Sequence, residues 1–196
     1  NDLPNAFQGR DNFVICETGF GTGLNFLAVW KLFEENTGPQ HRLHFVSFEK
    51  FPLAPEVIGE ALQEWRGDLG DRVDRLVAIY PMRVPGFHRI EITERITLSL
   101  IFGDVNEEMH QLDAAVNCWF LDGFRPASNP DMWSDEVFSQ MARLSVPGAT
   151  FATFTAAGFV KRALQATGFD TQKVKGFGRK REMLRGQYVG EVEEGV

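Results

Sequence analysis

Three glycines at alternate positions follow an acidic residue near the start of the chain. Residues 14–30 read "VICETGFGTGLNFLAVW", with Glu17 before Gly19, Gly21 and Gly23. Glycine permits positive φ and lets the backbone approach a ligand closely. A loop between the carboxyl end of a strand and the amino end of a helix presents free N–H groups. This segment therefore predicts a loop that cradles a nucleotide-like ligand, by a phosphate or by a carboxylate.

The spacing of the glycines narrows the choice of ligand. Leu24 stands where the dinucleotide fingerprint G-x-G-x-x-G would have its third glycine, and no Lys-Ser or Lys-Thr pair of a P-loop follows. An acid followed by G-x-G-x-G resembles motif I of S-adenosylmethionine-dependent methyltransferases. The loop alone leaves two alternatives open, a tight turn without a ligand and an NAD site.

Two further acids follow apolar, strand-like runs. Glu49 ends "HFVSFEK" and can accept hydrogen bonds from both hydroxyls of a ribose, in an NAD site as well as in an S-adenosylmethionine site. Asp104 ends "FGD" and suits either an adenine amino group or the N-cap of a helix. Together with their neighbours, the predicted cofactor contacts are Glu17, Gly19, Phe20, Gly21, Gly23, Asn25, Glu49, Lys50, Gly103, Asp104 and Asp122.

An aromatic, proline-containing loop follows another apolar run. The stretch "WFLDGFRPASNPDMW" (119–133) delivers Asp122 at the carboxyl end of a strand, the edge where open α/β sheets bind ligands. An acid there can orient an amine nucleophile or accept its proton, so Asp122 is the predicted catalytic residue. The predicted substrate contacts on this loop are Phe124, Pro126, Asn129, Met132 and Trp133; core packing is an equally good interpretation of Trp133.

A basic cluster lies near the end of the chain, in "KVKGFGRKRE" (173–182). Neutralising phosphates with a few cations is enough to anchor RNA. The alternative is a solvated hairpin tip. The predicted substrate contacts in this hairpin are Lys175, Phe177, Arg179, Lys180 and Arg181.

Composition sets limits on these predictions. The chain of 196 residues has a net charge of −7 and a pI of about 5.1, which argues against binding nucleic acid over the whole surface but allows a local basic patch. The two cysteines and four histidines show no metal-ligand spacing, so we expect no metal. The absence of a secretory signal and of a long apolar run predicts a cytoplasmic protein without a membrane span.

Strand-like and helix-like runs alternate along the chain. Alternation of this kind is typical of an α/β sheet that is mostly parallel, with helices on both faces. A short connection between 169–175 and 181–189 makes the last two strands antiparallel, as in class I methyltransferases. We therefore predict a class I, Rossmann-like fold with seven strands and a small inserted β-pair over 88–102.

Three regions follow from this organisation. Residues 1–12 form a polar, turn-rich segment that we interpret as a truncated amino terminus, because the chain begins without Met. Residues 13–189 form the methyltransferase domain. Residues 190–196 are an acidic tail or the start of a linker.

Six segments in collinear order carry a family resemblance: "ETGFGTGLNFL", "HFVSFEKFPL", "FGDVNE", "WFLDGFRPASNPDMW", "TFATFTAAGFVKRAL" and "KGFGRKREML". From about residue 13 to 186, the chain resembles the methyltransferase domain of the MnmC family, the bifunctional proteins of tRNA 5-methylaminomethyl-2-thiouridine biosynthesis. The resemblance implies methyl transfer from S-adenosylmethionine to the amine of 5-aminomethyl-2-thiouridine at the tRNA wobble position. It also implies an FAD-dependent oxidoreductase partner, as a domain or a separate protein, whose dinucleotide fingerprint this chain lacks.

Two other functions stay open at this point. One is S-adenosylmethionine-dependent methylation of a different amine, and the other is a non-catalytic RNA-binding module. An adenine-N6 methyltransferase is disfavoured, because "NPDM" lacks the second proline and the aromatic residue of that class and lies several residues too late.

Overall fold

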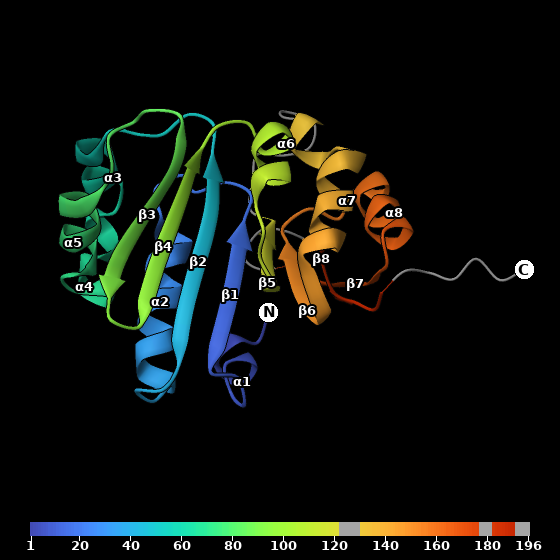
Figure 1. Cartoon of the computed structure of the whole chain (residues 1–196), viewed down its shortest axis with the longest axis horizontal. Coiled ribbons are helices and arrows are strands. Elements are labelled where there is room, and N and C mark those ends of the chain that lie inside the picture. The colour runs from blue at the N-terminus through green and yellow to red at the C-terminus, as the bar shows by residue number, and fades with distance from the viewer. Residues whose placement is uncertain (122–129, 177–181, 191–196) are drawn as a thin grey trace, which may run out of the picture. The chain divides into compact units, whose positions relative to one another are not determined.

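The computed structural model describes residues 1–121, 130–176 and 182–190 (Figure 1). The chain divides into two compact units. We call Asp2–Phe13 with Gly19–Asp104 the glycine-loop unit. We call Asn1 and Val14–Thr18 with Val105–Val196 the hairpin unit.

Three strands form the sheet of the glycine-loop unit, in the order β3-β4-β2. Strand β2 (Arg42–Glu49) is parallel to β4 (Ile96–Phe102), and β3 (Gly86–Thr93) is antiparallel to β4. The predicted antiparallel pair of β3 and β4 is confirmed, but β4 also pairs in parallel with β2 and is therefore part of the main sheet rather than an insertion. The register pairs Glu49 with Phe102, so the carboxyl ends of β2 and β4 lie side by side.

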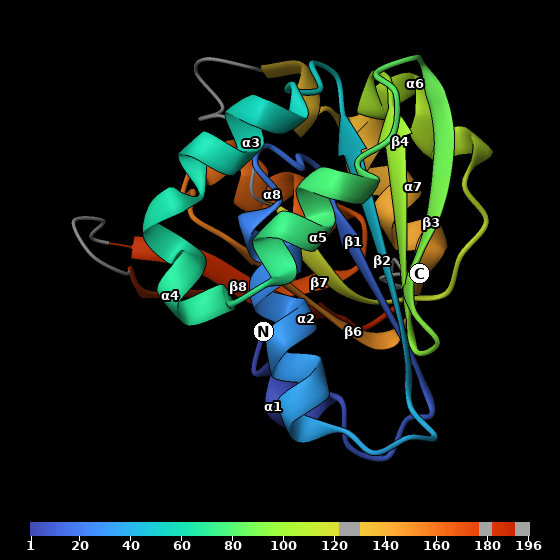
Figure 2. The same ribbon diagram turned by 90° about the vertical axis from the view of Figure 1, so that its left-hand side faces the viewer.

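Helices cover one face of this sheet, as Figure 2 shows for α2, α4 and α5. Phenylalanine side chains contribute to this core, where the rings of Phe26 and Phe45 meet edge to face at 5.3 Å. The helical elements of the unit are α1 (Leu3–Ala6), α2 (Leu24–Asn36), α3 (Pro55–Ala61), a 3-10 turn η1 (Gln63–Trp65), α4 (Arg66–Leu69) and α5 (Arg72–Ile79).

The segment before residue 13 contributes to the core rather than forming only turns. Helix α1 buries Leu3, and the ring of Phe7 lies 5.1 Å from Phe13 and 5.3 Å from Phe33. The segment looks polar, but its two large apolar side chains, Leu3 and Phe7, are both buried.

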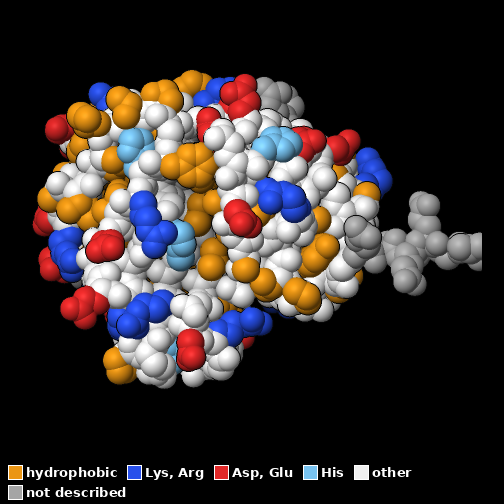
Figure 3. Space-filling view, in the orientation of Figure 1, with side chains coloured by type: hydrophobic (Ala, Val, Ile, Leu, Met, Phe, Trp, Pro, Cys, Tyr) orange, Lys and Arg blue, Asp and Glu red, His pale blue; other side chains and the backbone are white. Residues whose placement is uncertain are grey.

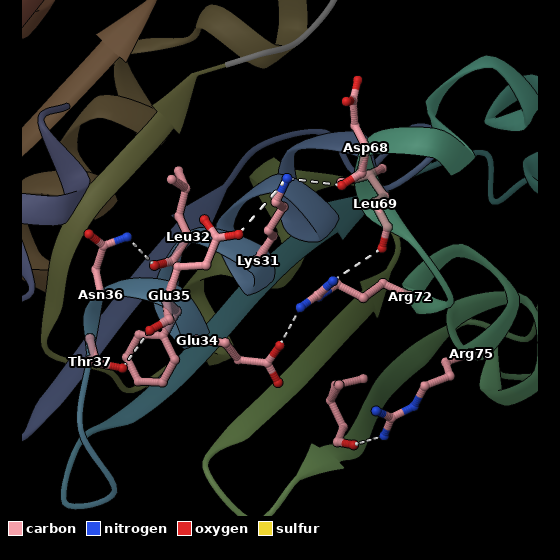
Figure 4. A network of polar contacts seen from close by, with 12 residues as sticks. Lys31, Leu32, Glu34, Glu35, Asn36, Thr37, Asp68, Leu69, Arg72 and Arg75 are labelled. Atoms are coloured by element: carbon pink, nitrogen blue, oxygen red, sulfur yellow. Dashed lines mark hydrogen bonds and ion pairs between the residues drawn. The ribbon is translucent and has the colours of Figure 1, made fainter.

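A polar network joins α2 to the helices that follow (Figure 4). Lys31 donates to the backbone carbonyl of Asp68 at 3.0 Å, and Arg72 pairs with Glu34 at 2.6 Å. Arg75 donates to a carbonyl of β3 at 2.7 Å. The bonds of Lys31 and Glu34 tie α2, the helix that begins directly after the three glycines, to α4 and α5.

The hairpin unit orders its strands β1-β5-β6-β8-β7. Strands β1 (Asn12–Glu17), β5 (Val116–Leu121) and β6 (Ser145–Thr153) are parallel neighbours, while β7 (Phe169–Lys175) and β8 (Glu182–Tyr188) form an antiparallel hairpin. Its helical elements are α6 (Val105–Glu108), the 3-10 turns η2 (Met109–Gln111) and η3 (Pro130–Trp133), α7 (Asp135–Leu144) and α8 (Gly158–Ala166).

The predicted fold class is confirmed, with eight strands among the described residues instead of seven. The terminal antiparallel hairpin is confirmed as well. No helix in the described ranges combines the length and the apolar character that crossing a bilayer requires.

Candidate cofactor site

The three-glycine loop turns from β1 into α2 through two left-handed residues. Gly21 has φ of +56° and Gly23 has φ of +79°, conformations that side chains with a Cβ rarely adopt. A Cβ on Gly23 would also lie 2.6 Å from Cζ of Phe20 and 2.9 Å from Cδ2 of Leu76. The loop can therefore close only because glycine occupies position 23.

Phe20 has a packing role in this loop. Its side chain is buried, and its backbone N–H donates to the carbonyl of Phe48 at 3.0 Å. The ring fills the space beneath Gly23. A cofactor contact by Phe20, as predicted, would therefore have to come from its backbone or its ring edge.

Glu49 lies at the end of β2 and holds the loop by its carboxylate. Oε2 accepts from the backbone N–H of Gly21 at 2.9 Å, and Oε1 accepts from the backbone N–H of Phe51 at 2.8 Å. A carboxylate has about four lone-pair positions, so each oxygen can accept a further hydrogen bond. The two backbone bonds orient the carboxylate and leave it able to bind a diol.

Asp104 follows β4 and is joined to the residue after Glu49. Nζ of Lys50 lies 2.7 Å from Oδ2 of Asp104, and the backbone N–H of Gly103 donates to the carbonyl of Glu49 at 3.1 Å. The pair is partly exposed, so its charges are screened by solvent and we give it an orienting role. The structure thus brings Gly21, Glu49, Lys50, Gly103 and Asp104 into one cluster, at the ends of neighbouring parallel strands.

Tyr80 belongs to this cluster, and sequence reasoning missed it. Its ring lies 6.2 Å from that of Phe20 and 5.9 Å from that of Phe102. Burial raises the pKa of the Tyr80 hydroxyl above its usual value, and the negative charge of Glu49 contributes a smaller increase. Tyr80 follows α5 without an apolar repeat or a glycine to mark it, so no local pattern in the sequence indicates its place.

Glu17 and Asn25 lie on either side of the glycines in the chain. Glu17 ends β1 in the hairpin unit and is fully buried, and Asn25 lies in the first turn of α2. A fully buried acid is rare in folded proteins unless it has partners, and Glu17 does take part in polar interactions. Cofactor contacts by these two residues stay predictions, as does the contact predicted for Gly19.

The predicted substrate loop lies mostly outside the described residues, which applies to Asp122, Phe124, Pro126 and Asn129. Trp133, in η3, is 6% exposed, and its ring lies 6.5 Å from that of Phe138. The geometry of Trp133 therefore favours core packing, one of the two interpretations that the sequence left open. The side chain of Met132 beside it is half-buried.

The basic hairpin is described up to its turn. Lys175 ends β7 with an exposed side chain, while Lys173 pairs with Glu182 across the hairpin at 3.1 Å. The charge of Lys173 is therefore already paired within the chain. The remaining predicted contacts, Phe177, Arg179, Lys180 and Arg181, lie outside the described residues.

The cysteines are buried free thiols. Burial raises the pKa of Cys118 to about 12 and that of Cys16 well above its ordinary value, so neither thiolate is available as a nucleophile near neutral pH. In the part of the chain that the structure describes, no three His, Cys, Asp or Glu side chains gather as metal ligands would.

Comparison with known proteins identifies the family of the chain. Residues 68–189 match a family model described as S-adenosyl-L-methionine-dependent methyltransferase. The chain is 54% identical, over 95% of its length, to a tRNA 5-methylaminomethyl-2-thiouridine biosynthesis bifunctional protein, MnmC, of Ectopseudomonas mendocina. It spans only 28% of that relative.

Two solved structures share the fold at low sequence identity. MnmC2 of Aquifex aeolicus aligns with a TM-score of 0.71 at 22% identity, over 98% of this chain and 59% of the other. TrmN of Thermus thermophilus aligns with a TM-score of 0.54 at 14% identity, over 95% and 47%. With the family model matching more than half of its residues, the chain belongs to the S-adenosyl-L-methionine-dependent methyltransferase family.

Proposed function

We propose that this chain transfers the methyl group of S-adenosylmethionine to the primary amine of 5-aminomethyl-2-thiouridine at the wobble position of tRNA. The product is 5-methylaminomethyl-2-thiouridine. The observation that carries the proposal is the Glu49 carboxylate, which is joined to the glycine loop in a chain 54% identical to a protein named for this biosynthesis. We expect such an enzyme in the cytoplasm, where tRNA is modified.

The residues present fit the cofactor. Glu49 offers two oriented carboxylate oxygens to the ribose hydroxyls, and Asp104 offers an acceptor to the adenine amino group. The amino-terminal turn of α2, at the positive end of the helix dipole, suits the carboxylate of the methionine moiety. When bound, the sulfonium supplies an activated methyl group whose departure leaves a neutral thioether.

The protein must then align the amine with the methyl group and accept the proton that the amine loses. The amine attacks only when it is uncharged, and Asp122 is our candidate for hydrogen-bonding it and accepting its proton. General-base assistance contributes about 10²–10⁴-fold, and alignment of the reacting atoms contributes about 7–11 kcal/mol in favourable cases. Asp122→Asn should therefore lower the rate of methyl transfer by about 10²-fold or more. Because Asp122 is also a predicted cofactor contact, the Kd for S-adenosylmethionine is measured on the same variant, and the loss of rate at saturating cofactor reports the role of Asp122 in the transfer step.

The partners follow from the same assignment. The cations of the β7–β8 hairpin, including Lys175, would bind tRNA phosphates, each contact adding to the salt dependence of binding. The chain spans 28% of its bifunctional relative, and the family resemblance implies an FAD-dependent oxidoreductase as the second component. That component would deliver the free amine that this chain methylates.

The test is methyl transfer from labelled S-adenosylmethionine to tRNA isolated from cells that lack only this methylation. We expect label in that tRNA and none in tRNA that already carries the methylated nucleoside. Label in free amines without label in tRNA would favour another amine substrate. Binding of tRNA without any transfer would favour a non-catalytic RNA-binding module.

A further inference from the structure

Tyr80 has an unpaired buried hydroxyl on a ring that packs against Phe20 of the glycine loop and Phe102 at the end of β4. The residue is 9% exposed, and its hydroxyl oxygen is buried without a hydrogen-bond partner among the described residues. Leaving such a group unpaired costs about 1–3 kcal/mol, so the great majority of buried hydroxyls have a partner. An orphan at this position therefore calls for an explanation.

The surroundings of Tyr80 come from all three segments that form the cluster. Phe20 belongs to the glycine loop, and Phe102 ends β4 just before Gly103 and Asp104. The carboxylate of Glu49, at the end of β2, acts electrostatically on the phenol. The Tyr80 ring thus contacts the glycine loop and the end of β4, and the charge at the end of β2 acts on its hydroxyl.

Glu49 is the charged acceptor that the geometry brings near this hydroxyl, because the ring of Phe102, 5.9 Å from that of Tyr80, belongs to the residue paired with Glu49 in the sheet. In the ligand-free protein, its two oxygens are oriented by the N–H groups of Gly21 and Phe51. A bound ribose diol would donate further hydrogen bonds to the same two oxygens, and the carboxylate would adjust to its new donors. The carboxylate still has lone pairs for one more donor, and the neutral phenol can supply it.

We propose that Tyr80 is a positioning residue for Glu49, whose hydroxyl donates to the Glu49 carboxylate only when S-adenosylmethionine is bound. The inference rests on the proposed role of Glu49 in holding the ribose. It explains why the hydroxyl is buried yet unpaired. The free energy lost by burying the hydroxyl without a partner is regained when it forms a hydrogen bond in the complex. Binding therefore gains a hydrogen bond that the empty protein lacks.

The experiment measures two quantities on Tyr80→Phe, which keeps the ring and removes only the hydroxyl. The Kd for S-adenosylhomocysteine, by calorimetry, should rise about 2- to 10-fold, the worth of one hydrogen bond. The Tm of the ligand-free protein should equal or exceed that of the wild type, because no native bond is lost. Tyr188→Phe, the other tyrosine of the sequence, is the matched control and should change neither quantity.

A double-mutant cycle with Glu49→Gln tests that Tyr80 acts through Glu49. The second substitution should add less to the Kd in the presence of the first than it does alone. An unchanged Kd in Tyr80→Phe, a lowered ligand-free Tm, or additive effects would overturn the inference. If Glu49→Gln weakens binding and Tyr80→Phe does not, the proposed site stands without Tyr80; if the wild type binds no S-adenosylhomocysteine, the site itself fails.

Discussion

Glu49 illustrates how one side chain can organise a binding loop and remain available to a ligand. Each of its oxygens accepts a single backbone N–H, from Gly21 in the loop and from Phe51 in its own strand's extension. Backbone donors cannot rotate away as a lysine or an arginine can. The carboxylate is therefore set in one orientation before a ligand arrives, which reduces the entropy lost on binding.

Glu49→Gln should raise the Kd for S-adenosylhomocysteine about 10- to 100-fold. The amide replaces a charged acceptor worth about 1.5–3 kcal/mol per bond, and its NH₂ group faces an N–H donor. Calorimetry measures the effect, with Glu91→Gln on the exposed part of β3 as the control. Equal affinity in the two variants would remove Glu49 from the site.

The two cysteine thiols should be inert in the folded protein. Their raised pKa values leave almost no thiolate at pH 8, and both side chains are fully buried. A disulfide-exchange reagent at pH 8 should react slowly with the native protein and with two thiols per chain after denaturation in urea. Rapid reaction without denaturant would contradict the described burial.

Sequence reasoning located the acids and glycines of the site but not its aromatic part. Glu49 and Asp104 could be predicted as neighbours because each follows an apolar run, and parallel strands end at one edge. Tyr80 could not, because its contacts with Phe20 and Phe102 join segments far apart in the chain. The same lack of long-range information left the two interpretations of Trp133 equal.

At the scale of elements, the start of α2 depends on the backbone of Gly23. Gly23→Ala should destabilise the protein by about 1–3 kcal/mol, through left-handed strain and the clash with Phe20. Urea unfolding measures the change. Gly67→Ala is the control: Gly67 lies in α4 with open space around its Cα, so alanine there should raise stability by about 0.5–1 kcal/mol.

Two elements show where pattern recognition failed and why. Strand β4 alternates in a way that suits a hairpin with β3, and this local signal concealed its parallel pairing with β2. Helix α1 is too short for a helical repeat to be recognised, so its buried Leu3 and the neighbouring Phe7 were overlooked. In both cases contacts with residues far away in the chain, and not the local pattern, determine the structure.

At the scale of the whole molecule, stability should decrease as the pH falls below about 6.5. Burial, then the positive charge of Arg89, lowers the pKa of His44, so the unfolded chain takes up a proton that the folded protein resists. The free energy of unfolding in urea should therefore be greater at pH 8 than at pH 5.5. Figure 3 shows histidine side chains next to Lys or Arg side chains on one face of the molecule.

His44→Gln should remove part of this pH dependence, whereas His41→Gln, in the connection just before β2, should preserve it. His44 also hydrogen-bonds Oγ of Ser99 at 2.8 Å, which glutamine can still do. Comparison of the two variants at both pH values separates the protonation effect from any loss of packing. An unchanged pH profile in His44→Gln would exclude His44 as the source.

The central claim is that the methyl group goes to one particular amine in tRNA. Mass analysis of nucleosides from tRNA that carries 5-aminomethyl-2-thiouridine, after incubation with the protein and S-adenosylmethionine, tests it most directly. The account predicts that this nucleoside disappears and that 5-methylaminomethyl-2-thiouridine replaces it in equal amount. A methyl group found on any other nucleoside, with the aminomethyl precursor unchanged, would contradict the account.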